Sequence, residues 1–221
     1  MKTLRNIQTK DRIAQSIRDE ILSGHMKPGE ELAQEALAEM LGVSRMPVRE
    51  ALQTLVQDGF ARRMPNRHIQ AVVLDSQQIH AVFWIAGTIE AELVALILEK
   101  QRKDGENVTS DLSGIGRELR KILQFMEEVS DSDHKIQYEM EFHECLIHMA
   151  DNPYLEQLQN KVMDGYVSYA ISNLTEKGQV LHMLQEAAEA VEKRDAGAAG
   201  AALKEYYMYY ADRFTERWRR Q

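Results

Sequence analysis

The sequence contains a single cysteine, Cys145, among its 221 residues. One cysteine excludes an internal disulfide and favours a reducing compartment such as the cytoplasm. Long hydrophobic runs are also missing. The longest apolar stretch, residues 82–89, already includes Gly87 and Thr88, and it is far shorter than the roughly 18 residues of a membrane-spanning helix. The first residues lack the apolar segment of a signal peptide, so we expect a cytoplasmic protein with no membrane partner.

Positive charge is scarce and unevenly distributed. The chain has 27 Lys and Arg against 35 Asp and Glu, a formal net charge of −8. Residues 1–75 hold 11 basic and 10 acidic side chains, whereas residues 76–221 hold 16 and 25. An acidic body repels nucleic acid, so any DNA-binding surface must be local and confined to the first part of the chain.

That first part opens with two segments of helical periodicity. Regularly spaced isoleucines predict a helix over residues 8–23. A turn at residues 27–30 separates it from a short second helix over residues 34–41. We expect Leu37 and Leu41 of the second helix to face the core.

A third helix is expected just after Gly42. Ser44 can cap it by accepting a backbone N–H, and Pro47 fits its first turn, where the missing N–H costs nothing. Two short helices joined by a glycine turn form the helix-turn-helix pattern. The third helix has an apolar stripe of four residues: Val48, Ala51, Leu52 and Leu55.

The other face of this third helix is basic near its start. Arg45 and Arg49 lie one turn apart and project together, with Met46 beside them. Two forked guanidiniums at a helix N-terminus suit guanine edges and phosphates in the major groove of double-stranded DNA. The alternative is an ordinary solvated face on a small helical domain.

A basic β-hairpin, or wing, is expected next. Residue types predict strands over residues 60–64 and 69–74 around a turn at Pro65 and Asn66. Such a hairpin could follow a phosphate backbone or reach into the minor groove. Its strands and tip carry four basic residues: Arg62, Arg63, Arg67 and His68.

The run LAEMLGVSRMPVREAL, which begins at Leu37, resembles the signature of the GntR family of regulators. The resemblance covers residues 9–74 without a gap. It implies that residues at the positions of Ser44, Arg45 and Arg49 contact an operator and that a wing follows. The wing tip departs from the family, because this chain reads NRH where many members carry a glycine.

Residues 76–221 show helical periodicity almost throughout. Amphipathic stripes predict six helices, with loops near residues 103–110, 130–133 and 176–178. The expected fold is therefore mainly α, a winged helix-turn-helix followed by an all-α six-helix bundle. We expect residues 1–75 to form a DNA-binding domain and residues 76–221 an effector-binding and dimerisation domain.

Several positions within the bundle carry their own signals. Asn152 is placed to cap a fourth helix that opens with Pro153, and Asp195 to cap the sixth. The apolar stripe of the first bundle helix is expected to run from Ile79 to beyond Leu96. Cys145 lacks a basic neighbour and is not expected to be a nucleophile. Four histidines are expected to be exposed: His80, His134, His148 and His182.

A GntR-type head followed by six helices resembles the FCD, or FadR-like, branch of the family. The segments EMEFH, which ends at His143, and ADNPYL are similar to the motif of that branch. There an acidic residue and a histidine four apart bind a divalent metal with two further histidines. Glu139 and His143 take the first two positions, and carboxylate plus imidazole suits zinc, nickel or manganese. The other positions fall at Leu184 and Tyr206, and an arginine common in the branch is replaced at Ala86.

Two interpretations of this site remain open. Glu139 and His143 can form a buried hydrogen-bonded pair that, with Leu184 and Tyr206, anchors a small organic effector, and we favour this interpretation. The alternative is a divalent metal site of low affinity. Loss of the arginine at Ala86 also weakens the expectation of a small carboxylate as effector.

The function that follows is a homodimeric transcriptional repressor that binds a palindromic operator, with affinity modulated by a small-molecule effector of unknown identity. One rival is a helical-bundle metalloenzyme using Glu139 and His143. The sequence offers it no third ligand, no nucleophile with a base and no phosphate-binding loop, so we expect no enzyme. Another rival is an interaction protein whose helix-turn-helix is vestigial, against which Arg45 and Arg49 count.

Overall fold

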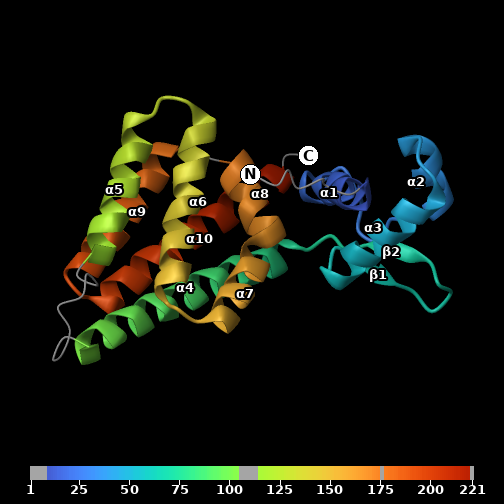
Figure 1. The fold of residues 1–221 in the computed structure, drawn as a ribbon. Coiled ribbons are helices and arrows are strands. Elements are labelled where there is room, and N and C mark those ends of the chain that lie inside the picture. Colours follow the sequence, from blue (N-terminus) through green and yellow to red (C-terminus); the bar gives the residue numbers. More distant parts are fainter. Residues whose placement is uncertain (1–8, 105–113, 175–176, 220–221) are drawn as a thin grey trace, which may run out of the picture. The chain divides into compact units, whose positions relative to one another are not determined.

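The computed structural model of the protein describes residues 9–104, 114–174 and 177–219. The chain divides into two compact units, one ending at Asp75 and the other beginning at Ser76 (Figure 1). Helices dominate both units, and the N-terminal unit adds a small antiparallel sheet. The fold class expected from the sequence, mainly α with a small hairpin, is confirmed.

The N-terminal unit contains three helices and a hairpin, as the sequence predicts. The helices are α1 (Thr9–Leu22), α2 (Gln34–Leu41) and α3 (Arg45–Gln57), and the strands are β1 (Ala61–Arg63) and β2 (Ile69–Ala71). The strands pair in antiparallel register, with Ala61 opposite Ala71. Both strands are shorter than the expected residues 60–64 and 69–74, although backbone hydrogen bonds continue beyond them, from Met64 N–H to His68 and from Val72 N–H to Phe60. The isoleucines of α1 and the apolar stripe of α3 form the core of this unit.

Two local expectations in this unit are wrong. Leu41 is 38% exposed, because Ala38 rather than Leu41 joins Leu37 on the buried face of α2. Ser44 occupies the N-cap position of α3 with an extended backbone, but its hydroxyl makes no capping hydrogen bond. Gly42, with φ at 63°, ends α2 in the left-handed conformation that glycine adopts without steric cost.

The C-terminal unit is a bundle in which the fourth of six expected helices is broken. Its elements are α4 (Ser76–Asp104), α5 (Ile115–Glu128), α6 (Ser132–Met149), α7 (Pro153–Val162), η2 (Met163–Val167), α8 (Ser168–Asn173), α9 (Lys177–Glu192) and α10 (Ala196–Arg219). The break is at Asp164, with ψ at 133°, and at Gly165, with φ at 95°. The periodicity of the sequence continues through this point, so it did not reveal the break.

Cap signals located the helix starts well. The Asn152 side chain accepts hydrogen bonds from the backbone N–H groups of Tyr154 and Leu155, and Asp195 accepts one from Ala198. Loop expectations were less accurate, because α4 continues to Asp104, α6 begins at Ser132, and α9 already includes residues 177–178. The remaining positions of the first expected loop, residues 105–110, and position 176 lie outside the described residues.

Helices α4 and α10 pack closely at the centre of this unit because small residues separate them. A Cβ atom placed on Gly87 of α4 would lie 3.1 Å from the Tyr207 ring of α10, and one on Gly200 would lie 3.0 Å from Ala91. The close approach brings the tyrosines of α10 against α4. It is the frame on which the buried polar groups described below are assembled.

Helix α4 has apolar residues on more than one face. Its segment Ser76–Lys100 is long and apolar enough to cross a membrane by length and composition, and half of it is buried in the structure. Leu96 was expected on the buried stripe but is 47% exposed. Trp84 and Ile85, which were not part of that stripe, are 52% and 50% exposed. Leu96 lies outside because α4 packs on α10, α6 and α7 through its other face. Packing against the neighbouring helices buries one apolar face of α4. The second apolar face, which carries Trp84, Ile85 and Leu96, is not covered by the described residues of this chain.

Candidate functional site

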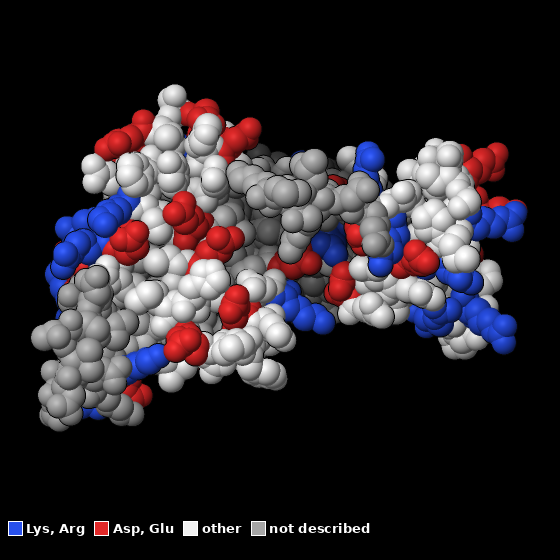
Figure 2. Space-filling model, in the orientation of Figure 1, with Lys and Arg blue, Asp and Glu red and all other residues white. Residues whose placement is uncertain are grey.

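The start of α3 presents an exposed basic surface. Because Val48 and Leu52 are buried against the core, Arg45, Met46 and Arg49 are turned to solvent, as the sequence predicts. Figure 2 shows Lys and Arg side chains gathered over the part of this unit that holds the hairpin. Basic groups on a helix of this size can contact base edges and phosphates in a major groove.

The guanidiniums on α3 already have partners. Arg45 is paired with Glu35 of α2, and its backbone carbonyl accepts a hydrogen bond from Gln34 Nε2 at 2.8 Å. Arg49 donates to Met46 Sδ at 3.0 Å. The Arg45 and Glu35 side chains are 66% and 73% exposed, so water screens their attraction. A DNA phosphate or base edge can replace such partners at little cost.

The hairpin adds further basic groups at its turn. Met64 N–H donates to the His68 carbonyl at 2.8 Å, and Arg67 N–H donates to the Met64 carbonyl at 2.9 Å. Arg67 has φ at 68°, the left-handed region that favours glycine. The glycine missing from the wing sequence is therefore replaced by an arginine in a glycine-like conformation. His68 Nδ1 lies 2.6 Å from Glu31 Oε1.

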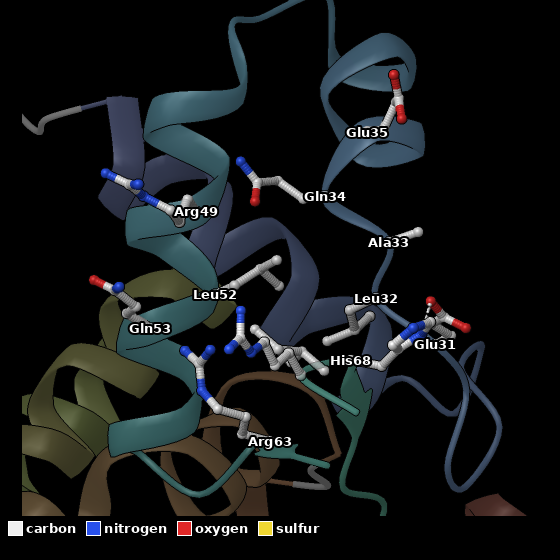
Figure 3. A pocket seen from close by; sticks show the side chains of 12 residues that line it. Glu31, Leu32, Ala33, Gln34, Glu35, Arg49, Leu52, Gln53, Arg63 and His68 are labelled. Atoms are coloured by element: carbon white, nitrogen blue, oxygen red, sulfur yellow. Dashed lines mark hydrogen bonds and ion pairs between the residues drawn. The ribbon is translucent and has the colours of Figure 1, made fainter. Parts of the chain in front are cut away.

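A hollow of about 340 Å³ lies between α3 and the hairpin. Figure 3 shows Arg49 and Gln53 of α3 on one side of it and Arg63 and His68 of the hairpin on another. Arg67 also lines it. The hollow thus brings together four of the expected DNA-contacting residues. Ser44, Arg45, Met46 and Arg62 are not among its lining residues.

Two acidic side chains in this hollow were not expected. Both Glu31 and Glu35 line it; Glu31 is paired with His68 and Glu35 with Arg45. The sequence signal was weak, because acidic residues are common at the start of a helix such as α2. The two carboxylates therefore pair with His68 and with Arg45, which lies just outside the hollow.

In the C-terminal unit, Glu139 and His143 of α6 belong to a buried polar cluster. Their exposures are 0% and 1%, and Tyr206 of α10 is equally buried. His143 Nε2 lies 2.9 Å from the Tyr206 hydroxyl, which donates to Glu139 Oε1 at 2.7 Å. Tyr210 also donates to Glu139. The carboxylate and the imidazole are therefore linked through a tyrosine hydroxyl.

A second carboxylate, Glu90 of α4, completes this cluster and was missed by the sequence analysis. Its side chain is 0% exposed, and Glu90 Oε1 lies 2.8 Å from His143 Nδ1. A signal was available: Glu90 follows Phe83 and Ala86 at helical spacing, so a charge lies on the core face of α4.

The hydrogen bonds around His143, to Glu90 and to Tyr206, are those that a doubly protonated ring can donate. Tyr206 has one proton and gives it to Glu139, so the bond between Tyr206 and His143 must be donated by Nε2–H. Glu90 can only accept from Nδ1–H. Burial alone would lower the pKa of His143, but the charge of Glu90, the hydrogen bond to it and the charge of Glu139 outweigh burial and raise that pKa. The raised pKa favours the protonated form of His143.

These residues do not fit a metal ion. Both nitrogens of His143 are already engaged, Nδ1 with Glu90 and Nε2 with Tyr206, whereas a histidine ligand must offer a free, unprotonated nitrogen. Tyr206 stands at one of the remaining expected ligand positions, and Leu184 at the other is a buried hydrocarbon. Across the described ranges, no group of three or more His, Cys, Asp or Glu side chains could hold a metal. Leu184 itself is fully buried in α9.

Two further groups adjoin the cluster. Tyr207 of α10 accepts a hydrogen bond from Gln159 Nε2 at 3.4 Å and donates to Met163 Sδ at 3.1 Å. Burial, the charge of Glu90 and a side-chain hydrogen bond to Glu90 raise the pKa of Tyr207 well above its ordinary value. Gln159 is fully buried on α7, and its spacing of four from Leu155 and Met163 was the signal for this position.

The other histidines and the cysteine mostly match expectation. His134, His148 and His182 are exposed. His80 is not, because it bridges the Ser76 carbonyl at 2.7 Å and Asp212 at 2.9 Å. Burial, with the charges of two nearby glutamates, raises the pKa of the Cys145 thiol to about 11. This keeps the thiol protonated at neutral pH, which disfavours nucleophilic chemistry.

Comparison with known proteins matches each unit to a described family. Residues 9–69 match the bacterial regulatory proteins of the gntR family, and residues 81–208 match the FCD domain. YdhC of Bacillus subtilis (strain 168), an HTH-type transcriptional regulator, is 25% identical over 182 residues, 81% of this chain and 79% of the relative. The gluconate operon transcriptional repressor of the same organism is 26% identical over 172 residues, 75% of this chain and 66% of the relative.

Solved structures add support for the fold. The E. coli McbR/YncC structure matches with a TM-score of 0.60 at 21% identity, covering 95% of this chain and 98% of that one. At this level of identity the similarity concerns the fold.

Proposed function

The chain belongs to the gntR family of bacterial regulatory proteins and carries an FCD domain, and from this premise we propose that it is a homodimeric repressor whose affinity for a palindromic operator is modulated by a small molecule. The N-terminal unit, residues 1–75, binds the DNA. The C-terminal unit, residues 76–221, binds the effector and forms the dimer. The resemblance of a relative named as an operon repressor favours repression.

The hollow between α3 and the hairpin is the observation that carries DNA binding. It collects Arg49, Arg63, Arg67 and His68 on one surface of an otherwise acidic protein. We assign Arg45, Met46 and Arg49 to base edges in the major groove, with Ser44 at the start of the helix. The hairpin residues Arg62, Arg63, Arg67 and His68 are assigned to phosphates or the minor groove.

Dimerisation is supported by the second apolar face of α4. Trp84, Ile85 and Leu96 are about half exposed along one helix, and apolar surface of this kind is commonly covered by a partner. Two copies joined there would place two reading heads on a symmetric site. Light scattering on Trp84→Glu tests this: a monomer is expected, and a variant that stays dimeric would move the interface elsewhere.

The effector is assigned to the polar cluster of Glu139, His143 and Tyr206, together with Leu184. Charged and polar groups among apolar helices provide orientation for a small ligand. A metalloenzyme is disfavoured because, among the described residues, no group of three or more His, Cys, Asp or Glu side chains could hold a metal. A regulator of this kind acts where the chromosome lies, in the bacterial cytoplasm.

Binding to DNA from upstream of the protein's own gene tests the central claim. Arg45→Ala and Arg49→Ala should each lower specific affinity by about 1–3 kcal/mol if the residues contact base edges. The matched control is Arg117→Ala, an exposed arginine of the C-terminal unit, which should leave binding unchanged. Unchanged binding in both α3 variants would remove this face as the reading surface, and no binding by the wild type to any promoter fragment would favour an interaction protein.

A further inference from the structure

We propose that Met46 of α3 recognises the 5-methyl group of a thymine in the major groove, and that this thymine neighbours a guanine bound by Arg49. The inference rests on the proposed function, because it requires α3 to lie in the major groove of operator DNA. It goes further by assigning one chemical group of the operator to one side chain. It also predicts a step in each half-site, a guanine next to a thymine in either order.

Met46 is an apolar side chain on a polar surface. It is 55% exposed, whereas Val48, Leu52 and Leu55 of the same helix are buried. Folding removes little of Met46 from water, so the core of the unit does not account for a large apolar residue at this position. Methionine is adaptable and is enriched where proteins contact partners, so its place here indicates an apolar group on the partner. The other exposed positions on this part of α3 are charged or polar: Arg45, Arg49, Glu50 and Gln53.

Met46 lies beside the guanidinium of Arg49, which donates from Nη2 to Met46 Sδ at 3.0 Å. Residues three apart share a face of a helix and lie about 4.5 Å apart along its axis. Stacked bases of one DNA strand are separated by a similar distance, about 3.4 Å. The fork-shaped guanidinium of Arg49 suits guanine O6 and N7. Met46 would then face the base pair next to that guanine.

Thymine offers the group that a methionine can recognise at this base pair. In the major groove guanine presents two acceptors, adenine an acceptor and a donor, and cytosine a donor, whereas thymine adds an apolar methyl group. The methionine side chain has no donor, and its sulfur is only a weak acceptor. Against the other bases it would displace water from polar edges without replacing the hydrogen bonds, which is costly. Contact with the thymine methyl instead removes apolar surface from water on both sides.

Base analogues in a DNA duplex that the full-length protein selects from a random library test the proposal. Each thymine is replaced in turn by deoxyuridine, which lacks only the 5-methyl group. At one position in each half-site the replacement should weaken wild-type binding about fourfold, the effect of leaving one methyl group uncovered. Met46→Ala should bind the thymine and deoxyuridine duplexes equally. Met46→Leu keeps a large apolar side chain and should retain most of the difference.

A second analogue tests the neighbouring guanine. 7-Deazaguanine lacks the N7 acceptor, and next to that thymine it should weaken binding by the wild type but not by Arg49→Ala. The methyl group can also be restored on another base: with cytosine in place of the thymine, 5-methylcytosine should bind the wild type better than cytosine does. The matched control is Met40→Ala, because Met40 of α2 is a methionine that is 77% exposed. It should respond to deoxyuridine as the wild type does.

Several outcomes would overturn the inference. These are wild-type binding that no deoxyuridine replacement weakens, an equal response to deoxyuridine in Met46→Ala and the wild type, and selected half-sites without the guanine–thymine step. If Met46→Ala loses the response to 7-deazaguanine but keeps the response to deoxyuridine, Met46 only positions Arg49. A selected duplex with no methyl effect refutes this inference alone. Failure to select any duplex refutes the proposed function.

Discussion

The two polar sites of this protein differ in how their charges are held. In the N-terminal unit, Arg45 and Arg49 are exposed and paired with side chains that solvent also reaches. In the C-terminal unit, Glu90, Glu139 and His143 are fully buried and hydrogen-bonded. Exposed pairs are weak and exchangeable, which suits a large polyanion that must bind and leave. Buried pairs are costly to break, which suits a fixed frame for a small ligand.

The largest expected effect comes from removing a charge of the buried cluster in the C-terminal unit. His143→Ala leaves Glu90 and Glu139 without their cation and should destabilise the C-terminal unit by about 3–5 kcal/mol. Urea unfolding followed by circular dichroism measures this change. The control is His182→Ala at an exposed position on α9, with a change within about 0.5 kcal/mol. Equal stability in the two variants would show that the cluster is not electrostatically coupled.

The pH dependence of stability sharpens the same contrast. The pKa of His143 is raised in the folded protein above its ordinary value of 6.5, through Glu90 of α4 and Glu139 of α6, with Tyr206 and Tyr207 of α10 beside it. Its stabilisation is therefore complete below pH 6.5 and is lost as pH rises through the folded pKa. The free energy of unfolding should fall by up to about 1.4 kcal/mol per pH unit in that window.

Urea unfolding from pH 6 to pH 9 measures this slope in the wild type and in His143→Gln. The glutamine variant cannot titrate and should lose the contribution. A slope of the same size in both proteins would assign it to other groups.

On the exposed side, the helix and the hairpin are expected to contribute differently. Arg63→Ala should weaken binding to all DNA sequences alike and reduce the slope of log affinity against log salt by about 1. Arg49→Ala should instead relax sequence preference. Titrations of operator and scrambled DNA at several salt concentrations separate the two. Loss of specificity with Arg63→Ala at an unchanged salt slope would reverse the assignment.

The smallest expected effect tests whether the exposed pair is exchangeable. Glu35→Gln releases Arg45 and should raise DNA affinity by about 1 kcal/mol or less. Glu39→Gln changes the same charge at an exposed position on the same helix, and it should raise affinity less. Equal effects would indicate a general change of charge, and weaker binding by Glu35→Gln would mean that Glu35 positions Arg45 for DNA.

The sequence by itself determined the helix-turn-helix, the hairpin and the exposed arginines of α3. Local signals are sufficient there, because caps, turn residues and a single apolar stripe specify which face of one helix is buried. The same kind of signal located Asn152 and Asp195 as helix caps. It could not detect the break at Gly165, where the apolar periodicity continues although the backbone departs from the helix.

Only the tertiary structure decided the composition of the buried cluster. Glu90, His143 and Tyr206 are separated by 53 and 63 residues, and they meet because glycines allow α4 and α10 to pack closely. Periodicity can place a carboxylate on the core face of a helix, but it cannot say what that carboxylate meets. The side chains that α4 and α10 place beside Glu139 and His143 determine whether these two residues bind a metal or form hydrogen bonds with tyrosines. The outcome is decided by packing, because a buried charge takes whichever partner the neighbouring helix presents.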